Sequence, residues 1–180
     1  MGSHYLGPWR IDVEWRVGVA RLLPEAQLAR VAVAALDAAG APRPASLGLI
    51  LSDDTELAEL NEAHMGKHGP TDVLSFPLLP PDAYPPHAGK VSGAPSVPGE
   101  DFALPPGVRT HLGDIVVSVE RAMDQAAAGR GGQTGDVRWD ARDELRLLVT
   151  HGVLHVCGWD HAEPGEEAVM RAQERSLIGA

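Results

Sequence analysis

Hydrophobic and polar residues alternate along two segments, residues 11–19 and 47–51, and a period of two predicts β-strands. A third strand is predicted over residues 72–76, ended by Pro77, which cannot continue a central strand. Residues 112–119 contain a continuous apolar run, which is typical of a buried strand. The pattern thus predicts roughly four strands distributed over most of the chain.

Helical periods occupy much of the remaining sequence. A helix is predicted over residues 24–40, and Asp53 followed by Glu56 forms the capping-box pattern that begins a second, short helix. Further helices are predicted over residues 120–128, 137–157 and 163–178. The helix over 137–157 is apolar almost all round in its second half, so we expect it to lie at the centre of the fold.

Residues 79–108 interrupt this order. They contain eight prolines and four glycines without a steady hydrophobic period, which predicts a long surface excursion, partly disordered. The 180 residues suffice for one hydrophobic core. We therefore predict an α+β fold: a single domain over residues 1–180, with a mixed, roughly four-stranded sheet covered by helices and an insertion at about 79–108.

Composition narrows the functional classes. The apolar fraction of 44% and the charged fraction of 22% are those of a soluble globular protein. Cys157 is the only cysteine, which excludes an intrachain disulfide and agrees with a cytoplasmic location. No apolar run is long enough for a signal peptide or a membrane span, so no membrane partner is expected. The net charge of -10 argues against a broad electrostatic grip on nucleic acid, although it permits a local basic groove.

The most informative segment is HGVLHVCGWDH, residues 151–161. His151 and His155 are four residues apart, so on a helix they project from one face, the spacing that two imidazoles need to bind one metal ion. Gly158 is placed to end the helix in the left-handed conformation, which lets the chain turn back and bring His161 to the third position. Three imidazoles leave a fourth position of a zinc ion open to water, as in catalytic sites that generate hydroxide for hydrolysis.

The three histidines also admit a purely structural role or a protease site. Ordinary buried histidines would each need a hydrogen-bond partner on a helix otherwise made of Leu and Val. Metzincin proteases share the histidine spacing, but they carry the general base Glu directly after the first His, where this chain has Gly152. A protease would therefore need its base from elsewhere in the fold.

The histidine segment resembles the signature of the YbeY family, bacterial metal-dependent endoribonucleases and ribosomal RNA maturation factors. Two further blocks are similar to that family and occur in its order. One comprises Leu60-Asn61, Gly66 and PTDVLSFP over residues 70–77; the other is LGDI over residues 112–115. The resemblance covers nearly the whole domain apart from the insertion and the N-terminal tail.

The resemblance implies an α+β fold and one zinc ion per chain held by His151, His155 and His161. Imidazole also suits other divalent ions such as Ni²⁺. It further implies a metal-dependent endoribonuclease domain that cleaves single-stranded RNA in small-subunit ribosomal RNA maturation and ribosome quality control. The implied partners are ribosomal RNA and the ribosome or its small subunit.

One departure affects the catalytic residues. Many family members carry a Tyr-Arg pair soon after the Leu-Asn, and here the pair is His64-Met65. Methionine cannot replace the planar, bidentate phosphate recognition of a guanidinium. Either Lys67, His64 or His68 binds the phosphate in place of the arginine, or cleavage depends mainly on the metal. His64 and His68 could instead be solvent-facing loop residues without a role in catalysis. The candidate catalytic residues are His151, Asp160, His64 and Lys67, with Asp160 expected to orient a ligand or transfer a proton.

Neighbouring residues receive supporting roles. We expect Thr71 and Asp72 to fix their loop by side-chain to backbone bonds and Ser75 to be structural. Asp114 is a candidate either to orient a ligating imidazole or to cap a backbone amide. Cys157 lies about 200° around the helix from His155, so it should point into the core.

The predicted reaction is metal-assisted hydrolysis of a phosphodiester. Attack by the ribose 2′-hydroxyl is the competing mechanism, and it would leave a cyclic phosphate. Besides the metalloprotease, the alternative function is a ribosome-assembly factor in which zinc is structural and RNA is bound but not cut. A fourth protein ligand that seals the metal would favour that alternative.

Overall fold

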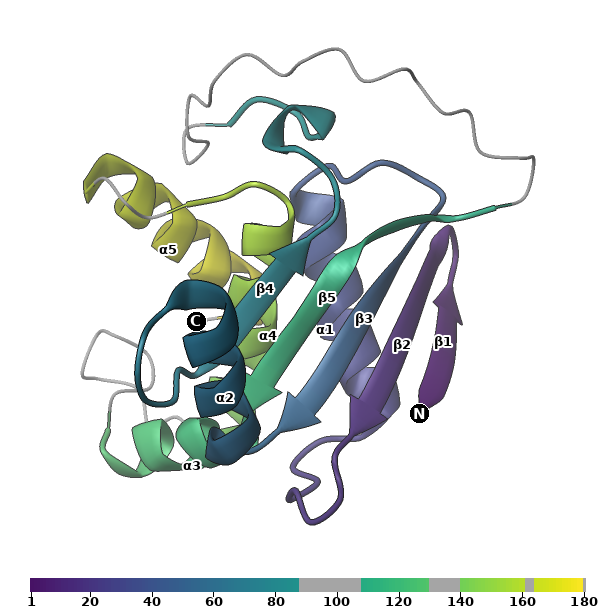
Figure 1. Cartoon of the computed structure of the whole chain (residues 1–180). Helices are drawn as coiled ribbons and strands as arrows, with labels where there is room; N and C mark the ends of the chain where they lie inside the picture. Colours follow the sequence, from purple (N-terminus) through teal and green to yellow (C-terminus); the bar gives the residue numbers. More distant parts are fainter. Residues whose placement is uncertain (88–107, 130–139, 161–163, 180) are drawn as a thin grey trace.

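The computed structural model describes residues 1–87, 108–129, 140–160 and 164–179. A five-stranded sheet in the order β1-β2-β3-β5-β4 forms the framework (Figure 1). Its strands are β1 (Gly2–Leu6), β2 (Trp9–Trp15), β3 (Ala45–Ser52), β4 (Val73–Pro77) and β5 (Thr110–Ser118). The three inner strands β2, β3 and β5 are parallel, whereas the edge strands β1 and β4 are antiparallel to their neighbours. The predicted α+β class with a mixed sheet is confirmed.

Helices cover both faces of this sheet. They are α1 (Glu25–Ala38), α2 (Asp54–Met65), α3 (Val119–Ala127), α4 (Ala141–Val156) and α5 (Pro164–Ile178), with a 3-10 turn at Pro81–Ala83. Helices α1 and α4 pack on one face, and α2 crosses the opposite face over β4 and β5 (Figure 1). None of the described helices is both long and apolar enough to cross a membrane.

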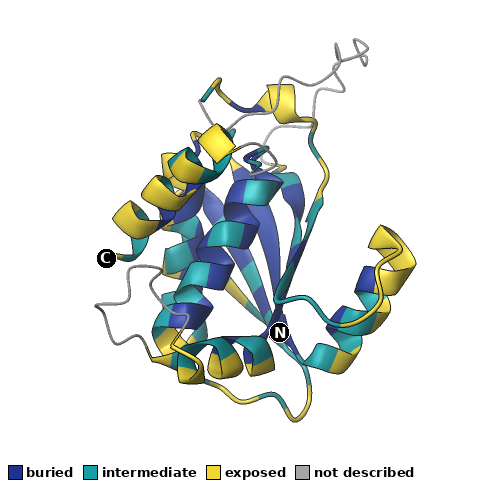
Figure 2. Ribbon diagram, turned by 90° about the vertical axis from the view of Figure 1, so that its left-hand side faces the viewer, coloured by how far each residue is buried: buried dark blue, intermediate teal, exposed yellow. Residues whose placement is uncertain are grey.

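Alternation along the inner strands builds the main core. Alternate residues in the central parts of β2, β3 and β5 are completely buried in the main core, together with residues of α1 and α4, which forms the dark interior in Figure 2. These residues are Ile11, Val13, Leu47, Leu49, Leu51, Ile115 and Val117. A smaller cluster of Leu57, Leu74 and Val116 fills the space under α2. Helix α4 is the central helix that the sequence predicts, since nine of its residues from Glu144 to Val156 are buried.

The structure adds one strand that the sequence did not predict. Strand β1 pairs antiparallel with β2, from Gly2 opposite Val13 to Leu6 opposite Trp9. Its inward positions include Gly2 and His4 and are only half buried, so the strand lacks the hydrophobic period of the inner strands. In the other direction, the strand predicted over 11–19 ends at Trp15, because Val17 is fully exposed at 101% and Gly18 has a left-handed φ of 87°.

The start of the predicted insertion is mostly exposed, as predicted, but one of its side chains is anchored in the core. Residues 79–87 lie within the described chain, and Tyr84 among them is buried in the main core at 3% exposure. Burial also raises the pKa of Tyr84, because the charged form of its hydroxyl would lose hydration. The single aromatic side chain therefore fixes this part of the segment, and residues 88–107 lie outside the described chain.

Candidate metal centre

His151 and His155 lie side by side near the end of α4. Their Nε2 atoms are 3.0 Å apart, and the rings meet edge to face with centroids separated by 4.5 Å. This is the same-face arrangement that a spacing of four residues gives on a helix. Both side chains are only half buried, so a ligand from solvent can reach the two nitrogens.

The turn after α4 carries the chain back toward these histidines. The backbone N–H of Trp159 donates to Leu154 O at 3.1 Å, and that of Gly158 donates to His155 O at 3.0 Å. Together with the φ of +80° at Gly158, these bonds form the Schellman ending of a helix. The left-handed glycine that the sequence predicts is therefore present. His161, the third predicted ligand, lies outside the described residues.

An open cleft of about 950 Å³ extends from the histidine pair. One wall consists of His151, His155 and Asp160, which belong to α4 and the following turn. The facing wall is the segment between α2 and the end of β4, and its lining residues include Met65, Lys67, His68, Thr71, Asp72 and Ser75. The fold thus brings the histidine segment opposite the second sequence block.

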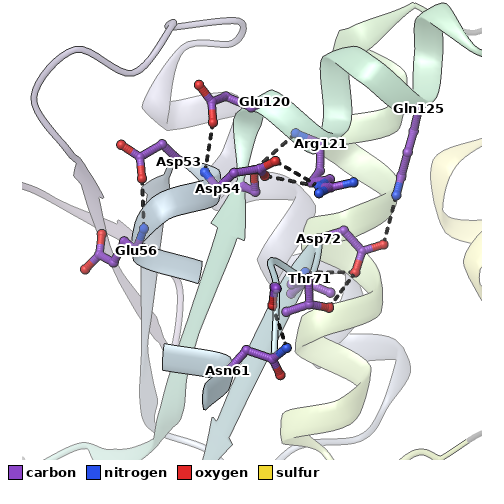
Figure 3. Close-up of polar contacts among 12 residues, drawn as sticks. Asp53, Asp54, Glu56, Asn61, Thr71, Asp72, Glu120, Arg121 and Gln125 are labelled. Carbon is purple, nitrogen blue, oxygen red and sulfur yellow. Dashed lines mark hydrogen bonds and ion pairs between the residues drawn. The ribbon is translucent and has the colours of Figure 1, made fainter. Parts of the chain in front are cut away.

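Asn61 explains why the loop after α2 keeps its position. Its side chain is buried at 7% exposure and donates from Nδ2 to Gly69 O at 2.8 Å (Figure 3). Gly66 ends α2 in the left-handed conformation, and the N–H of Lys67 bonds to Asn61 O. The Asn-Gly pair of the sequence block therefore shapes the loop that presents Lys67 to the cleft.

Asp72 fixes the far end of the same loop. Its Oδ1 accepts from Val73 N at 2.9 Å and from Thr71 Oγ1 at 3.3 Å, and its Oδ2 accepts from Gln125 Nε2 on α3 at 3.2 Å (Figure 3). Ser75 Oγ donates to Gly152 O at 3.0 Å and ties β4 to α4. The side-chain to backbone bond predicted for Asp72 and the structural role predicted for Ser75 are confirmed, whereas Thr71 bonds to the side chain of Asp72 instead of to the backbone.

Gly152 faces the sheet rather than the cleft. A Cβ atom added to it would lie 2.9 Å from Val73 Cγ2 and 3.3 Å from Ile115 Cγ2, closer than ordinary contact. The glycine therefore allows α4 to approach β4 and β5 between the two histidines. A glutamate at this position would be directed into the core, so the position cannot supply the base that metzincin proteases use.

A buried carboxylate that the sequence analysis did not identify contacts His151. Glu174 of α5 is 5% exposed, and its Oε1 lies 2.7 Å from His151 Nδ1. A carboxylate only accepts hydrogen bonds, so Nδ1 of His151 is the donor in this contact, and Nε2 is the nitrogen on the side of His155. Its position four residues after the buried Met170, on the inward face of a mostly polar helix, was the available signal.

Asp114 does not take the orienting role offered for it. It lies on β5 and accepts from His111 Nε2 at 3.2 Å, away from His151 and His155. The reason is the strand period: Asp114 points to the face opposite Ile115, which contacts α4. Glu174 supplies the carboxylate instead.

The remaining candidates separate into cleft and non-cleft residues. Lys67 and Asp160 line the cleft. His64 does not; it sits on the last turn of α2, edge-on to Phe76 with ring centroids 5.2 Å apart. His68 lines the cleft but is highly exposed and pairs with Glu62 at 3.3 Å. Cys157 is fully buried, as predicted, and burial raises its pKa to about 12.

The donor atoms present fit a transition metal ion. Two nitrogen ligands of tetrahedral zinc lie about 3.3 Å apart, given zinc–nitrogen distances of roughly 2.0–2.1 Å. The 3.0 Å between the two Nε2 atoms is close to this separation. Imidazole nitrogens also select such ions over Mg²⁺ or Ca²⁺, which prefer oxygen. Within the described residues no group of three metal ligands forms, and the third histidine of the segment lies outside them.

Known proteins resemble this chain over most of its length. The family model described as endoribonuclease YbeY matches residues 18–180. An endoribonuclease YbeY of Salinispora tropica is 41% identical over 150 residues, which cover 83% of each chain. One from Thermobifida fusca is 38% identical over 168 residues, which cover 93% of this chain and 91% of that protein.

The solution structure of a Thermotoga maritima protein matches 94% of this chain and 89% of its own, with 20% identity and a TM-score of 0.48. The family assignment rests on the sequence matches, whose range includes the histidine segment and the wall that faces it.

Proposed function

Because this chain belongs to the endoribonuclease YbeY family, we propose that the cleft beside α4 is the active site of a metal-dependent endoribonuclease acting on single-stranded segments of ribosomal RNA. The family confirms the predicted class, an endoribonuclease with a role in ribosomal RNA processing. The observation that carries the site assignment is the His151–His155 pair, whose Nε2 atoms lie 3.0 Å apart at an open cleft.

The proposed metal ligands are His151, His155 and His161. Zinc is the proposed ion, with another imidazole-binding ion such as Ni²⁺ as the alternative. When bound, the ion supplies a Lewis acid for the phosphoryl oxygen and lowers the pKa of water. Three protein ligands leave one position for water or substrate, which is the arrangement that catalysis requires.

Two further side chains of the cleft receive roles in this proposal. Lys67, on the wall opposite α4, binds a phosphate oxygen of the RNA. It thereby takes the place of the arginine that many family members carry where this chain has Met65. Asp160, next to the third ligand, accepts a proton from the attacking water. His64 receives no role because it does not line the cleft.

The substrate assignment follows from the same cleft. The cleft has a volume of about 950 Å³ and lies between α4 and an irregular loop, a shape that suits a flexible single strand of RNA. We propose precursor ribosomal RNA as substrate, the small ribosomal subunit as the site of action and the cytoplasm as the location. The net charge of -10 favours contacts confined to the cleft over a broad electrostatic grip.

The test is cleavage of an end-labelled single-stranded RNA by the wild-type chain and by a His151→Ala, His155→Ala double variant, with metal content measured on both. We expect the wild type to hold about one metal ion per chain and to cut, and the variant to do neither. A wild type that binds metal and RNA but leaves the RNA intact would support the non-catalytic assembly factor instead. If every product ended in a cyclic phosphate, the nucleophile would be the ribose 2′-hydroxyl rather than water.

A further inference from the structure

Glu174 is a nearly fully buried carboxylate with one polar partner among the described residues. It is 5% exposed, and its hydrogen bond goes to His151 Nδ1 at 2.7 Å. Burying a carboxylate costs free energy that a single hydrogen bond does not generally recover. An apolar side chain in this position would pack against α4 at lower cost, so stability alone does not account for Glu174.

The contact determines which nitrogen of His151 presents a lone pair to the cleft. With Oε1 of Glu174 accepting from Nδ1–H, the proton cannot reside on Nε2 in the neutral ring. The same bond restricts rotation of the ring, and it keeps Nε2 within 3.0 Å of His155 Nε2. Carboxylates in this relation to a ligating imidazole also raise its basicity.

The contact joins α4 to α5, the two helices that precede and follow His161 in the sequence. On α5, Met170, one helical turn before Glu174, is buried in the main core at 1% exposure. The carboxylate is therefore held by a helix anchored in the core rather than by a mobile loop. A fixed acceptor of this kind preorganises the imidazole before the ion arrives.

We infer that Glu174 is a positioning residue for the metal centre: it holds His151 in the Nδ1–H tautomer so that Nε2 is ready to bind the ion. The inference rests on the proposed function only in assuming that His151 binds metal. It adds a residue of α5 to a metal centre whose proposed ligands all belong to the histidine segment.

The experiment compares the wild-type chain with Glu174→Gln and with the control Glu167→Gln. Glu167 lies on the same helix, pairs with Arg171 and does not line the pocket that His151 and Glu174 share, so the control makes the same change of charge without removing the contact to His151. Zinc affinity is measured by competition with a chromophoric chelator, and the Tm of each metal-free protein is measured alongside. Long-range ¹⁵N spectra of the metal-free proteins report the tautomer of His151.

We expect Glu174→Gln to weaken zinc binding by about 10–100-fold. The Tm of its metal-free form should be unchanged or raised, because a buried charge is removed. The wild-type imidazole spectrum should show the Nδ1–H form, whose share should fall in Glu174→Gln because a neutral amide accepts more weakly than a carboxylate and also carries a donor, and Glu167→Gln should match the wild type throughout.

Two outcomes would overturn the inference. Unchanged zinc affinity in Glu174→Gln, with a lowered Tm of the metal-free form, would make Glu174 merely structural and leave the proposed function intact. A wild-type chain that binds no zinc or other imidazole-binding ion would overturn the proposed function and this inference with it, so the two failures are distinguishable.

Discussion

Lys67 is the positively charged residue on the cleft wall that faces α4. It is exposed, it faces the histidine pair, and its backbone is fixed by the bond to Asn61 O. Its neighbour Met65 lines the same wall and offers no charge for a phosphate. The ammonium of Lys67 is therefore the cation that this wall presents to RNA within the described residues.

Replacing Lys67 by methionine should weaken RNA binding without affecting the fold. A lost charge-assisted hydrogen bond to phosphate corresponds to about a tenfold rise in KM for a single-stranded RNA, with kcat changed less. Lys67→Arg should restore binding, and Arg30→Met on α1, outside the cleft, is the control for loss of a surface cation. Steady-state cleavage at several salt concentrations measures the effect, and an unchanged KM and salt dependence would remove Lys67 from the site.

Among the secondary-structure elements, α2 is the one whose placement determines the second wall. Asp53 caps its first turn by accepting from Glu56 N at 2.9 Å (Figure 3). The side chain of Glu56 does not complete the predicted capping box; it accepts from Arg16 Nε at 2.9 Å and also contacts Ser52. The competing guanidinium, which arrives from the end of β2, explains why only half of the predicted motif forms.

The Arg16–Glu56 pair should make stability depend on pH. The Arg16 guanidinium lowers the pKa of Glu56 below its usual 4.5, so the pair stabilises the fold above that pH and loses its effect as pH falls through the depressed value. Glu56→Gln should cost about 1 kcal/mol in free energy of unfolding near neutral pH, since the pair is partly exposed. Urea unfolding at about pH 7 and at about pH 3 should show this cost shrinking in acid.

Glu59→Gln, a change at an exposed position of the same helix, is the matched control for the pH series. It should unfold like the wild type at both pH values. A Glu56→Gln cost that stays constant down to acid pH would show that packing, rather than the ion pair, carries the effect.

For the whole molecule, local period and spacing predicted the inner strands, the central α4 and the left-handed Gly158. Those features depend on residues close together in the chain. Strand β1 was missed because an edge strand with Gly2 and His4 on its inner side has no hydrophobic signal. Glu174 was missed because its partner lies 23 residues away, across a turn. Only the fold therefore shows that Glu174, and not Asp114, contacts His151.

At the scale of the whole molecule, an acidic chain carries a cleft lined by His151 and His155. Because the net charge is -10, the proposed function assigns phosphate binding to the metal and to Lys67 rather than to a basic surface. Gly152 faces the core, so the protease alternative would need its general base from another part of the fold. Metal-dependent RNA cleavage in this cleft is the central claim.

The measurement that tests this claim most directly is a zinc titration of the metal-free full chain, with the initial rate of single-stranded RNA cleavage recorded at each addition. The rate should rise in proportion to zinc up to about one ion per chain and then stay constant. A His155→Ala variant that remains folded should show no rise. Equal cleavage by metal-free protein, or intact RNA after full loading, would contradict the account.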